Sequence, residues 1–415
     1  MDENMHQQTI QRGIMYITRE IEALLKKVCL QFPAVAVTGA RQTGKSTLVR
    51  TAFPEFTYIT FDDPLQQERA QEDPNLFLDT LGDALILDEI QYVPELIPYL
   101  KIRIDQDRSK RSRYILTGSQ QFHLIRNLSE SLAGRIALLE LQPFSANEIR
   151  AIEENRELTV VDLFIKNCMR GTYPELAIYH DIESEIWYGS YLQTYLERDI
   201  RTIYDIGNLR DFRRLMQLLA SRQSQLLNMS TLARSIGVAV TTVKKWISVL
   251  EASNIIYLLQ PYYNNFGKRI SKSPKVYFLD CGLVCYLTGI KDPDHIMHGP
   301  MAGALFESFC LQESLKVYAN QGKQPGLYYL RTNNGLEVDL LIEAESMTVH
   351  PLEIKLTKTP KRSMVDPIDR FRSLFDRLNV KPGQLLCLSE QEIALTADNK
   401  VQPFFQYLEW LHNTI

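Results

Sequence analysis

Short apolar runs alternate with polar stretches and one helix-like segment over the first third of the chain. The runs at 34–38 (AVAVT), 84–91 (ALILDEIQ) and 113–119 (RYILTGS) are each short, apolar and rich in branched residues. Those features are typical of buried strands. The segment 46–53 (STLVRTAF) follows the first run and has the composition of a helix. This region therefore predicts an α/β sheet.

Farther along, apolar positions recur at helical spacing. Residues 145–210 are rich in helix formers and predict a helical segment. Residues 212–260 predict two short helices around a turn at 236–238. The inner positions of these helices are Leu232, Ala233 and Ile236 in the first, and Val243, Ile247 and Leu250 in the second. This spacing is typical of a helix-turn-helix. Two further apolar runs, between 254 and 278, predict the strands of a wing.

The last third contains two apolar runs, 336–342 and 347–356, which flank EAES at 343–346. We expect them to form a β-hairpin. Glu337 and Asp339 lie in the first run, and Glu353 and Lys355 lie in the second. Since side chains alternate along a strand, each pair projects from one face. Residues 359–415 then predict a helix, a strand and a terminal helix.

A phosphate-binding loop follows the first strand. The motif GARQTGKST comprises Gly39, Ala40, Arg41, Gln42, Thr43, Gly44, Lys45, Ser46 and Thr47. It fits the pattern G-x-x-x-x-G-K-[ST] between a strand and a helix. Backbone amides and a helix N-terminus would then face the phosphates of ATP. Lys45 would reach the β- and γ-phosphates, and the Ser46 hydroxyl would bind Mg²⁺.

The other two strands end in polar side chains. Asp88 would hold the Mg²⁺ ion, and Glu89 would polarise the attacking water. Thr117 and Ser119 could contact the γ-phosphate or that water. Arg135 lies between a helix and another strand. It is either a solvated arginine or an arginine finger for the ATP site of a neighbouring subunit.

These motifs resemble prokaryotic AAA-type ATPases that carry an appended C-terminal domain of unknown function. The similar stretches are VTGARQTGKSTLV, LILDEIQ, YILTGSQ, SLAGRI, GTYPE, YLQTYLERDI and LRTNNGLEVDLL. They extend from about residue 15 to residue 360. The resemblance implies ATP hydrolysis. An arginine finger at Arg135 would further imply a homo-oligomer, either a ring such as a hexamer or at least a dimer, because a neighbouring subunit would complete the site.

The hairpin resembles the core of the PD-(D/E)XK nuclease superfamily, whose motif is an Asp, a gap and then Glu-x-Lys. Asp339, Glu353 and Lys355 fit it, and Glu307 on a preceding helix adds a carboxylate. Such carboxylates bind a divalent cation, and the lysine activates water. Val338 replaces the proline that often precedes the Asp, so cleavage is not implied. Cross-strand ion pairs on a surface hairpin are the other interpretation.

The charge distribution favours a nucleic-acid partner for the middle of the chain. The 415 residues carry a net charge of −4, yet residues 221–275 contain eight basic side chains and one acidic one. We expect DNA contacts near the start of the second helix and at the wing tip, which means Thr241, Thr242, Lys244, Lys245, Lys268 and Arg269. A winged helix can instead bind protein or pack against the ATPase.

The apolar runs, the N-terminus and the cysteines indicate where in the cell the protein is expected. No apolar run is long enough to span a membrane, and no secretory signal is visible at the N-terminus. The six cysteines have no zinc-binding spacing, so we expect reduced thiols in a cytoplasmic protein.

The predicted fold is α/β and multi-domain, with four parts. A P-loop NTPase domain of the AAA type, with a parallel sheet and an N-terminal helix, spans 1–150; a helical lid or connector spans 151–210. A winged-helix module spans 211–275, and a restriction-endonuclease-like α/β domain spans 276–415. The predicted function is an ATPase that acts on duplex or branched DNA. The alternative is a nucleotide-controlled signalling or defence switch; a protein-remodelling ATPase is disfavoured because no aromatic pore-loop signature is evident.

Overall fold

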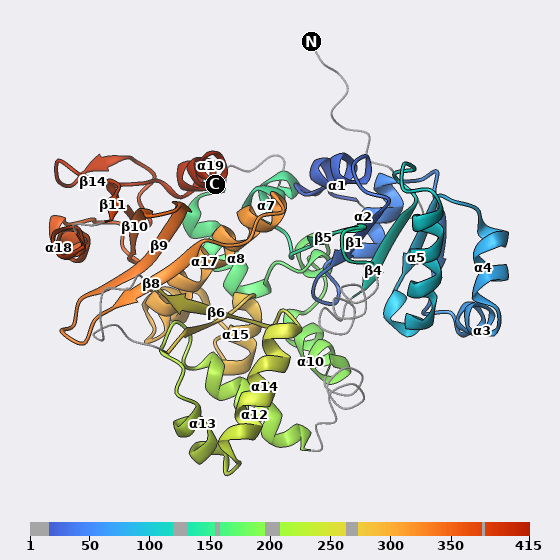
Figure 1. Ribbon diagram of the computed structural model, residues 1–415. Helices are drawn as coiled ribbons and strands as arrows, with labels where there is room; N and C mark the ends of the chain where they lie inside the picture. The colour runs from blue at the N-terminus through green and yellow to red at the C-terminus, as the bar shows by residue number, and fades with distance from the viewer. Residues whose placement is uncertain (1–15, 119–131, 154–157, 196–207, 263–272, 376–377) are drawn as a thin grey trace. The chain divides into compact units, whose positions relative to one another are not determined.

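The computed structural model describes residues 16–118, 132–153, 158–195, 208–262, 273–375 and 378–415 (Figure 1). The chain forms two compact units. The first comprises Met1–Glu154, Tyr173–Ile178 and Ala319–Lys323. The second comprises Asn155–Thr172, Tyr179–Tyr318 and Gln324–Ile415.

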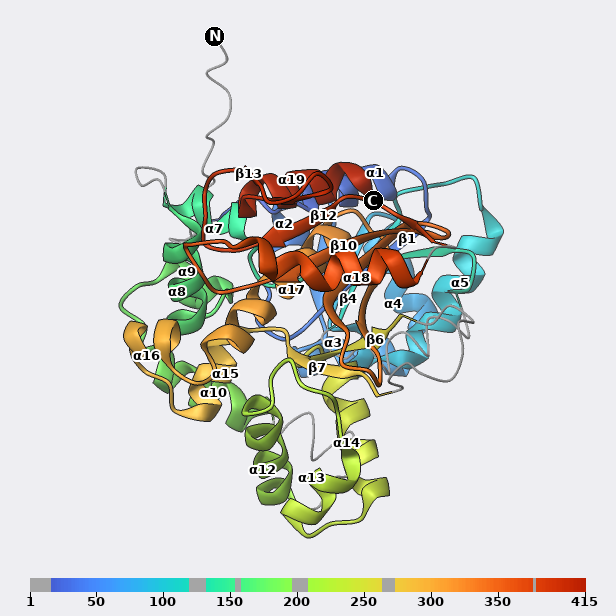
Figure 2. The ribbon, with the colours of Figure 1, turned by 90° about the vertical axis from the view of Figure 1, so that its left-hand side faces the viewer.

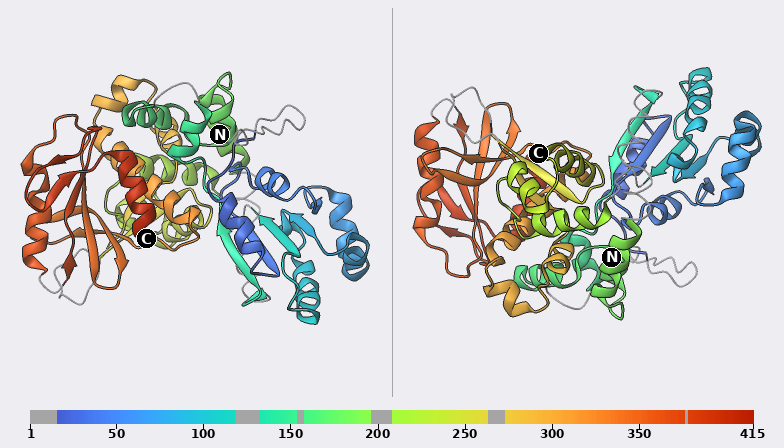
Figure 3. Two further views of the ribbon diagram at one scale, coloured as in Figure 1. Left: turned by 90° about the horizontal axis from the view of Figure 1, so that it is seen from above. Right: turned by 90° about the horizontal axis from the view of Figure 1, so that it is seen from below.

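The first unit is built around a five-stranded sheet. Its helices are α1 (Glu22–Cys29), α2 (Lys45–Ala52), α3 (Pro64–Glu72), α4 (Pro74–Leu81), α5 (Ile97–Gln106), α7 (Ala146–Ile152) and α9 (Pro174–Ile178), with 3₁₀ turns η1 (Ile90–Tyr92) and η2 (Pro94–Leu96). Its strands are β1 (Ala34–Thr38), β2 (Thr57–Thr60), β3 (Leu85–Asp88), β4 (Tyr114–Gly118) and β5 (Ile136–Glu140). They are all parallel, in the order β2-β3-β4-β1-β5. Figure 3 shows strands of this sheet as blue to green arrows.

Both faces of this sheet are covered by helices. Ala34 and Ala36 of β1 pack into a core with residues of α4 and α5. Val35 and Val37 point the other way and pack with residues of α1 and α2. A parallel sheet buried on both faces explains why its strands are continuous apolar runs. The parallel α/β sheet predicted from the sequence is confirmed.

The second unit contains a nine-stranded mixed sheet. Its strands are β6 (Ile256–Pro261), β7 (Lys275–Phe278), β8 (Leu327–Arg331), β9 (Glu337–Glu345), β10 (Thr348–Ile354), β11 (Asn379–Val380), β12 (Gly383–Leu386), β13 (Ile393–Ala394) and β14 (Asn399–Val401). The order is β13-β14-β12-β10-β9-β8-β6-β7, with β11 beside β10. Strands β8, β9 and β10 are antiparallel neighbours, whereas β12 runs parallel to β10.

Helices surround this sheet and complete the unit. They are α8 (Val160–Arg170), α10 (Ser184–Thr194), α12 (Leu209–Ala220), α13 (Met229–Ile236), α14 (Val240–Ala252), α15 (Cys281–Thr288), α16 (Pro293–His298), α17 (Ala302–Asn320), α18 (Asp366–Leu374) and α19 (Phe404–Thr414), with a 3₁₀ turn η4 (Arg362–Val365). Figure 2 shows α18 in front of β10, and Phe371 of α18 packs in the same core as Val338 and Val349 of the strands.

The four-part division of the chain remains a prediction, but one expected boundary falls inside an element. The boundary at 275/276 lies within β7. Strand β6 pairs with β7 on one side and with β8 on the other. The two strands expected to form a wing are therefore part of the C-terminal sheet, and the contacts place both in the second unit.

The hairpin of β9 and β10 is present, with a shorter turn than the sequence indicated. Strand β9 continues through Glu345, and the turn consists of Ser346 and Met347, whose φ is +66°. The EAES segment is therefore mostly strand.

The six cysteines are unpaired and buried. The reducing compartment expected from the sequence stays a prediction. Across the parts of the chain that the structure describes, no helix is long and apolar enough to cross a membrane.

Candidate functional site

The phosphate-binding loop connects β1 to α2 at the carboxyl end of the parallel sheet. Gln42 and Gly44 have left-handed backbones, with φ of +61° and +88°. Gly39 lies so close to β5 that a Cβ there would be 2.2 Å from the carbonyl oxygen of Leu141. The loop can follow this path only because Gly39 has no side chain.

Lys45 begins α2 and is buried in the loop. Its Nζ donates to the carbonyl oxygens of Gly39, at 3.2 Å, and Ala40, at 2.8 Å. Thr43 closes the same turn, because its Oγ1 donates to Ala40 at 3.0 Å. The ammonium group therefore lies inside a loop next to a helix N-terminus, a combination that suits an anion such as a phosphate.

Asp88, at the end of β3, accepts hydrogen bonds from three hydroxyl groups. Ser46 Oγ lies 2.8 Å from Oδ1, and Tyr58 Oη lies 2.6 Å from Oδ2. The third donor is Thr117 Oγ1. A carboxylate beside a serine hydroxyl offers the oxygen ligands that Mg²⁺ prefers, so Ser46 and Asp88 fit the predicted ion.

Tyr58 was not singled out in the sequence. It lies on β2, and no motif marks a tyrosine that must reach the next strand. Burial, followed by its hydrogen bond to Asp88, raises the pKa of Tyr58. The phenol consequently stays protonated at neutral pH and keeps one lone pair of Asp88 occupied.

Glu89 lies directly after Asp88 in a left-handed conformation, with φ of +55°. Its backbone N–H donates to Thr117 Oγ1 at 3.2 Å, so β3 and β4 end together. The side-chain amide of Gln91 donates to the Glu89 carboxylate. Gln91 was also missed by the sequence analysis. Ser119 lies outside the described residues.

Arg19 is hydrogen-bonded to the backbone of the phosphate-binding loop. It is 5% exposed, and its guanidinium donates to the carbonyl oxygens of Thr43, at 2.9 Å, and Gln142, at 2.7 Å. A third bond reaches Glu148 Oε1 at 2.9 Å. No local pattern could have revealed this contact, because Glu148 is 129 residues away in the chain.

We expect Arg19→Ala to raise the KM for ATP about tenfold, since the Thr43 carbonyl would lose a hydrogen bond from a charged donor. Its kcat should fall less, because Asp88 and Glu89 do not contact Arg19. The KM of Arg19→Lys should lie between those of the parent and Arg19→Ala, since one ammonium group cannot reach all three acceptors. Steady-state kinetics tests this, with the exposed Lys26→Ala as control; an unchanged KM would refute the anchoring role.

Arg135 is engaged within its own chain. Its Nε and Nη2 donate to the two oxygens of Asp105, at 2.7 and 2.9 Å, and its Nη1 donates to the carbonyl oxygen of Ala133. The hydrogen bond from Arg135 lowers the pKa of Asp105 to about 2. An arginine finger at this position would have to leave Asp105 first, and this role stays a prediction.

The helix pair of the second unit has the expected faces. Helices α13 and α14 are joined at Gly237, whose φ is +88°, and the predicted inner residues of both are buried. Thr241, Lys244 and Lys245 are exposed at the start of α14, and Thr242 is half-buried. Lys268 and Arg269 lie outside the described residues.

Lys275 is buried, which corrects its inclusion among the basic side chains expected to favour a nucleic-acid partner. In the sequence it is one of the eight basic side chains of residues 221–275, but it is only 3% exposed. Its Nζ lies 2.8 Å from Glu337 Oε1 and 3.2 Å from Glu307 Oε1. Burial alone would lower the pKa of Lys275, but the carboxylates of Glu307, Asp339 and Glu337 raise it. Lys275 therefore neutralises a buried acidic cluster and cannot contact a ligand in solvent.

Asp339 and Glu353 are brought together as the hairpin register requires. Leu340 of β9 pairs with Leu352 of β10. Because the strands are antiparallel, Asp339, which precedes Leu340, lies opposite Glu353, which follows Leu352. Lys355 Nζ bridges them, at 2.7 Å from Asp339 Oδ2 and 2.8 Å from Glu353 Oε2. Burial, and then the charge of Asp339, raises the pKa of Glu353 to about 9.

The three predicted metal ligands, Glu307, Asp339 and Glu353, thus share one polar cluster, but lysines lie among them. Glu353 Oε1 is buried and has no hydrogen-bond partner among the residues that the structure describes. In the described part of the chain, no three His, Cys, Asp or Glu side chains are arranged to hold a metal ion. The cation in this arrangement is the ammonium group of Lys275 or Lys355, and a divalent metal at the cluster stays a prediction.

Three regions of the chain match models of known protein families. Residues 31–150 match an AAA domain, 161–294 match a domain of unknown function (DUF8612), and 302–407 match another domain of unknown function (DUF4143). With the loop and the parallel sheet described above, the AAA match identifies the first unit as a P-loop ATPase of the AAA type.

Two mycobacterial proteins match nearly the whole chain. The uncharacterized proteins Rv2008c of Mycobacterium tuberculosis and Mb2031c of Mycobacterium bovis are each 33% identical over 385 residues, which is 92% of this chain and 83% of theirs. The chain belongs to their family. Among solved structures, the Walker-type ATPase of Pyrococcus abyssi is 16% identical, with a TM-score of 0.46 over 68% of this chain and 99% of that one.

Proposed function

We propose that this member of the family uses ATP hydrolysis to act on duplex or branched DNA. The observation that carries the proposal is the pairing of an ATPase unit with a helix pair that exposes Thr241, Lys244 and Lys245 at the start of α14. Basic and hydroxyl side chains at the start of the second helix suit contact with phosphates and base edges.

In the proposed ATP site, Lys45 and the amides from Gly39 to Thr47 bind the phosphates. Ser46 and Asp88 would hold Mg²⁺, which would neutralise negative charge on the phosphate oxygens. The Glu89 carboxylate accepts a proton from the attacking water. Thr117 aligns Asp88 and Glu89, since it hydrogen-bonds to both.

Two further features complete the proposal. An oligomeric ring would let Arg135 exchange Asp105 for the γ-phosphate of a neighbouring subunit. The C-terminal sheet would hold DNA as a nuclease-like domain without cutting it, because Lys275 and Lys355 neutralise the carboxylates that cleavage would need for a metal. The six unpaired cysteines support a reducing compartment, the cytoplasm.

We expect duplex or four-way DNA to stimulate ATP turnover, and Lys244→Ala combined with Lys245→Ala to weaken that DNA binding. Losing two phosphate contacts should reduce the slope of log affinity against log salt by about 2. Basal ATP hydrolysis should not change. An ATPase assay across single-stranded, duplex and four-way DNA, with binding measured over a salt series, tests this.

Lys400→Ala is the matched control, because Lys400 is paired with Glu392 on the same unit. Cleavage is scored in the same reactions, with Asp339→Ala as its control; a cut that survives this substitution would remove Asp339 from the site. If no form of DNA binds at low salt, the proposal fails. Slow hydrolysis that ignores DNA and depends on a protein partner would favour the signalling or defence switch.

A further inference from the structure

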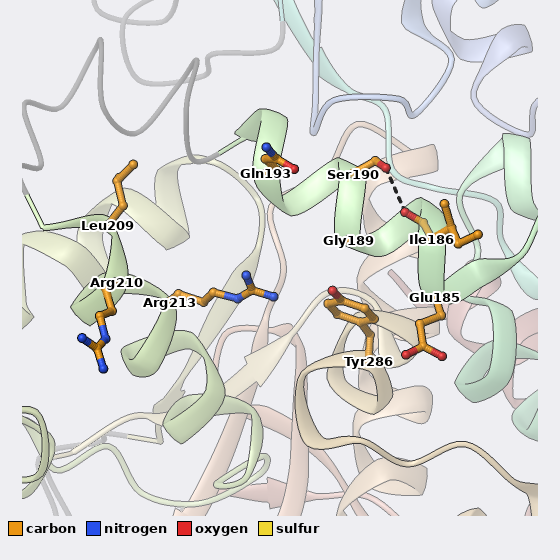
Figure 4. Close-up of a pocket in the computed structure, with 9 residues that line it drawn as sticks. All are labelled: Glu185, Ile186, Gly189, Ser190, Gln193, Leu209, Arg210, Arg213 and Tyr286. Atoms are coloured by element: carbon orange, nitrogen blue, oxygen red, sulfur yellow. Dashed lines mark hydrogen bonds between the residues drawn. The ribbon is translucent and has the colours of Figure 1, made fainter.

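A pocket of about 600 Å³ opens between three helices of the second unit. It lies between α10, the first turns of α12 and Tyr286 of α15 (Figure 4). Its volume is in the range of small-ligand sites, roughly 300–1,000 Å³. It is separate from both α14 and the carboxylate cluster, and neither the ATP site nor the proposed duplex contacts use it.

The pocket is electropositive. Arg213 extends from α12 toward the ring of Tyr286, whereas Arg210 points away from that ring (Figure 4). Within the described chain, the side chain of neither arginine has a hydrogen bond or an ion pair. The one acidic lining residue, Glu185, is already paired with Lys291 at 2.8 Å. An anion would therefore meet an arginine that no carboxylate neutralises.

Donors outnumber acceptors in the lining. Besides Arg213, the Tyr286 hydroxyl has no partner among the residues described, and Gln193 faces the pocket from α10 (Figure 4). Ser190 is the exception, because its hydroxyl donates to the carbonyl oxygen of Ile186 at 2.9 Å. A set of donors around an arginine matches the oxygen atoms of a phosphate.

An aromatic surface lies beside these donors. One face of Tyr286 stacks on Tyr188, with ring centroids 5.9 Å apart, and its side chain is half-buried. Gly189 faces the phenol, and a Cβ there would come within 3.2 Å of the hydroxyl oxygen. A glycine inside a helix is destabilising relative to alanine. Here it leaves the space in front of Tyr286 open.

We propose that this pocket binds one nucleotide unit of single-stranded DNA, with its phosphate on Arg213 and its base against Tyr286. Base stacking on an aromatic side chain is tolerant of sequence and typical of single-strand binding. In a duplex the bases are paired and stacked, so a base could lie against Tyr286 only after leaving the stack. The proposal rests on the proposed action on DNA and adds a strand-separated segment to its substrate.

The test measures how tightly a fluorescent oligothymidylate and a duplex of equal length bind to the full chain. The chain carries Lys45→Ala, so that binding at the ATP site does not contribute to the signal. We expect Arg213→Ala to weaken oligothymidylate binding about tenfold and to leave duplex binding unchanged. Gly189→Leu should have a similar effect by filling the pocket, and it should not break α10, since leucine favours helix more than glycine does.

Arg214→Ala is the matched control, because Arg214 is next in the helix and is already paired with Asp211 at 3.6 Å. If both pocket variants bind oligothymidylate as the parent does, the pocket proposal is overturned while duplex action stands. If neither DNA binds, both proposals fail. If AMP binds as tightly as the oligonucleotide and depends on Arg213, the ligand is a free nucleotide and the strand assignment is overturned.

Discussion

Glu89→Gln is expected to reduce ATP hydrolysis by about 10²–10⁴-fold while ATP still binds. The substitution removes the carboxylate that would accept the proton from water, and general-base catalysis contributes an effect of this size. Lys45 and the loop amides are unchanged, so affinity for ATP should stay within about twofold. Single-turnover phosphate release, together with equilibrium binding of a fluorescent ATP analogue, separates the two quantities.

Glu95→Gln is the matched control for this prediction. It makes the same chemical change at an exposed glutamate of the same loop region, and hydrolysis should be unaffected. Lys45→Ala should differ from Glu89→Gln by losing both binding and hydrolysis. If the Glu89→Gln protein hydrolyses ATP at the parent rate, a residue other than Glu89 accepts the proton from the attacking water.

Lys275→Ala is expected to destabilise the second unit by about 3–5 kcal/mol. The ammonium group is buried between Glu307 and Glu337, and its removal leaves the mostly buried Glu307 without a cation, whereas Glu337 keeps its pair with Arg331 at 3.6 Å. For a unit of this size the loss corresponds to a fall of roughly 10 °C in melting temperature. Thermal or urea unfolding followed by circular dichroism measures it.

Two variants make that result specific. Lys400→Ala removes an ion pair whose side chains are 41% and 50% exposed, and such a pair contributes at most about 1 kcal/mol. Adding Glu307→Gln to Lys275→Ala should restore part of the stability, because it removes one unpaired charge. If Lys275→Ala is no more harmful than Lys400→Ala, the buried cluster does not hold Lys275 as described.

Local patterns predicted a strand of the ATPase sheet and two helices of the second unit. The strand at 34–38 was found at its observed limits, and the helices at 229–236 and 240–252 have the buried faces that the periodicity indicated. Both features depend on residues close in sequence, since a buried strand or an amphipathic helix is visible in a window of a few residues. The loop motif likewise specifies its own conformation, with glycines where φ must be positive.

Contacts between distant segments were not predictable in the same way. Arg19 and Tyr58 belong to no motif, and Gln91 ends the stretch LILDEIQ but was given no role, although each holds a residue of the ATP site or the loop around it. The paired wing strands were predicted, but their union with β8 was not, because strand order depends on the packing of the whole sheet. A domain boundary was consequently expected inside β7.

The sequence by itself determined that this chain contains a phosphate-binding loop, an acidic strand end and a set of unpaired cysteines, because short motifs and composition carry that information. Only the tertiary structure decided the role of Lys275. In the sequence it is one of eight basic residues in a positive segment, and charge counts do not distinguish a solvated lysine from a buried one. In the fold, the register of β7 places it against Glu307 and Glu337. The free energy of burying these charges is then favourable only if they neutralise one another.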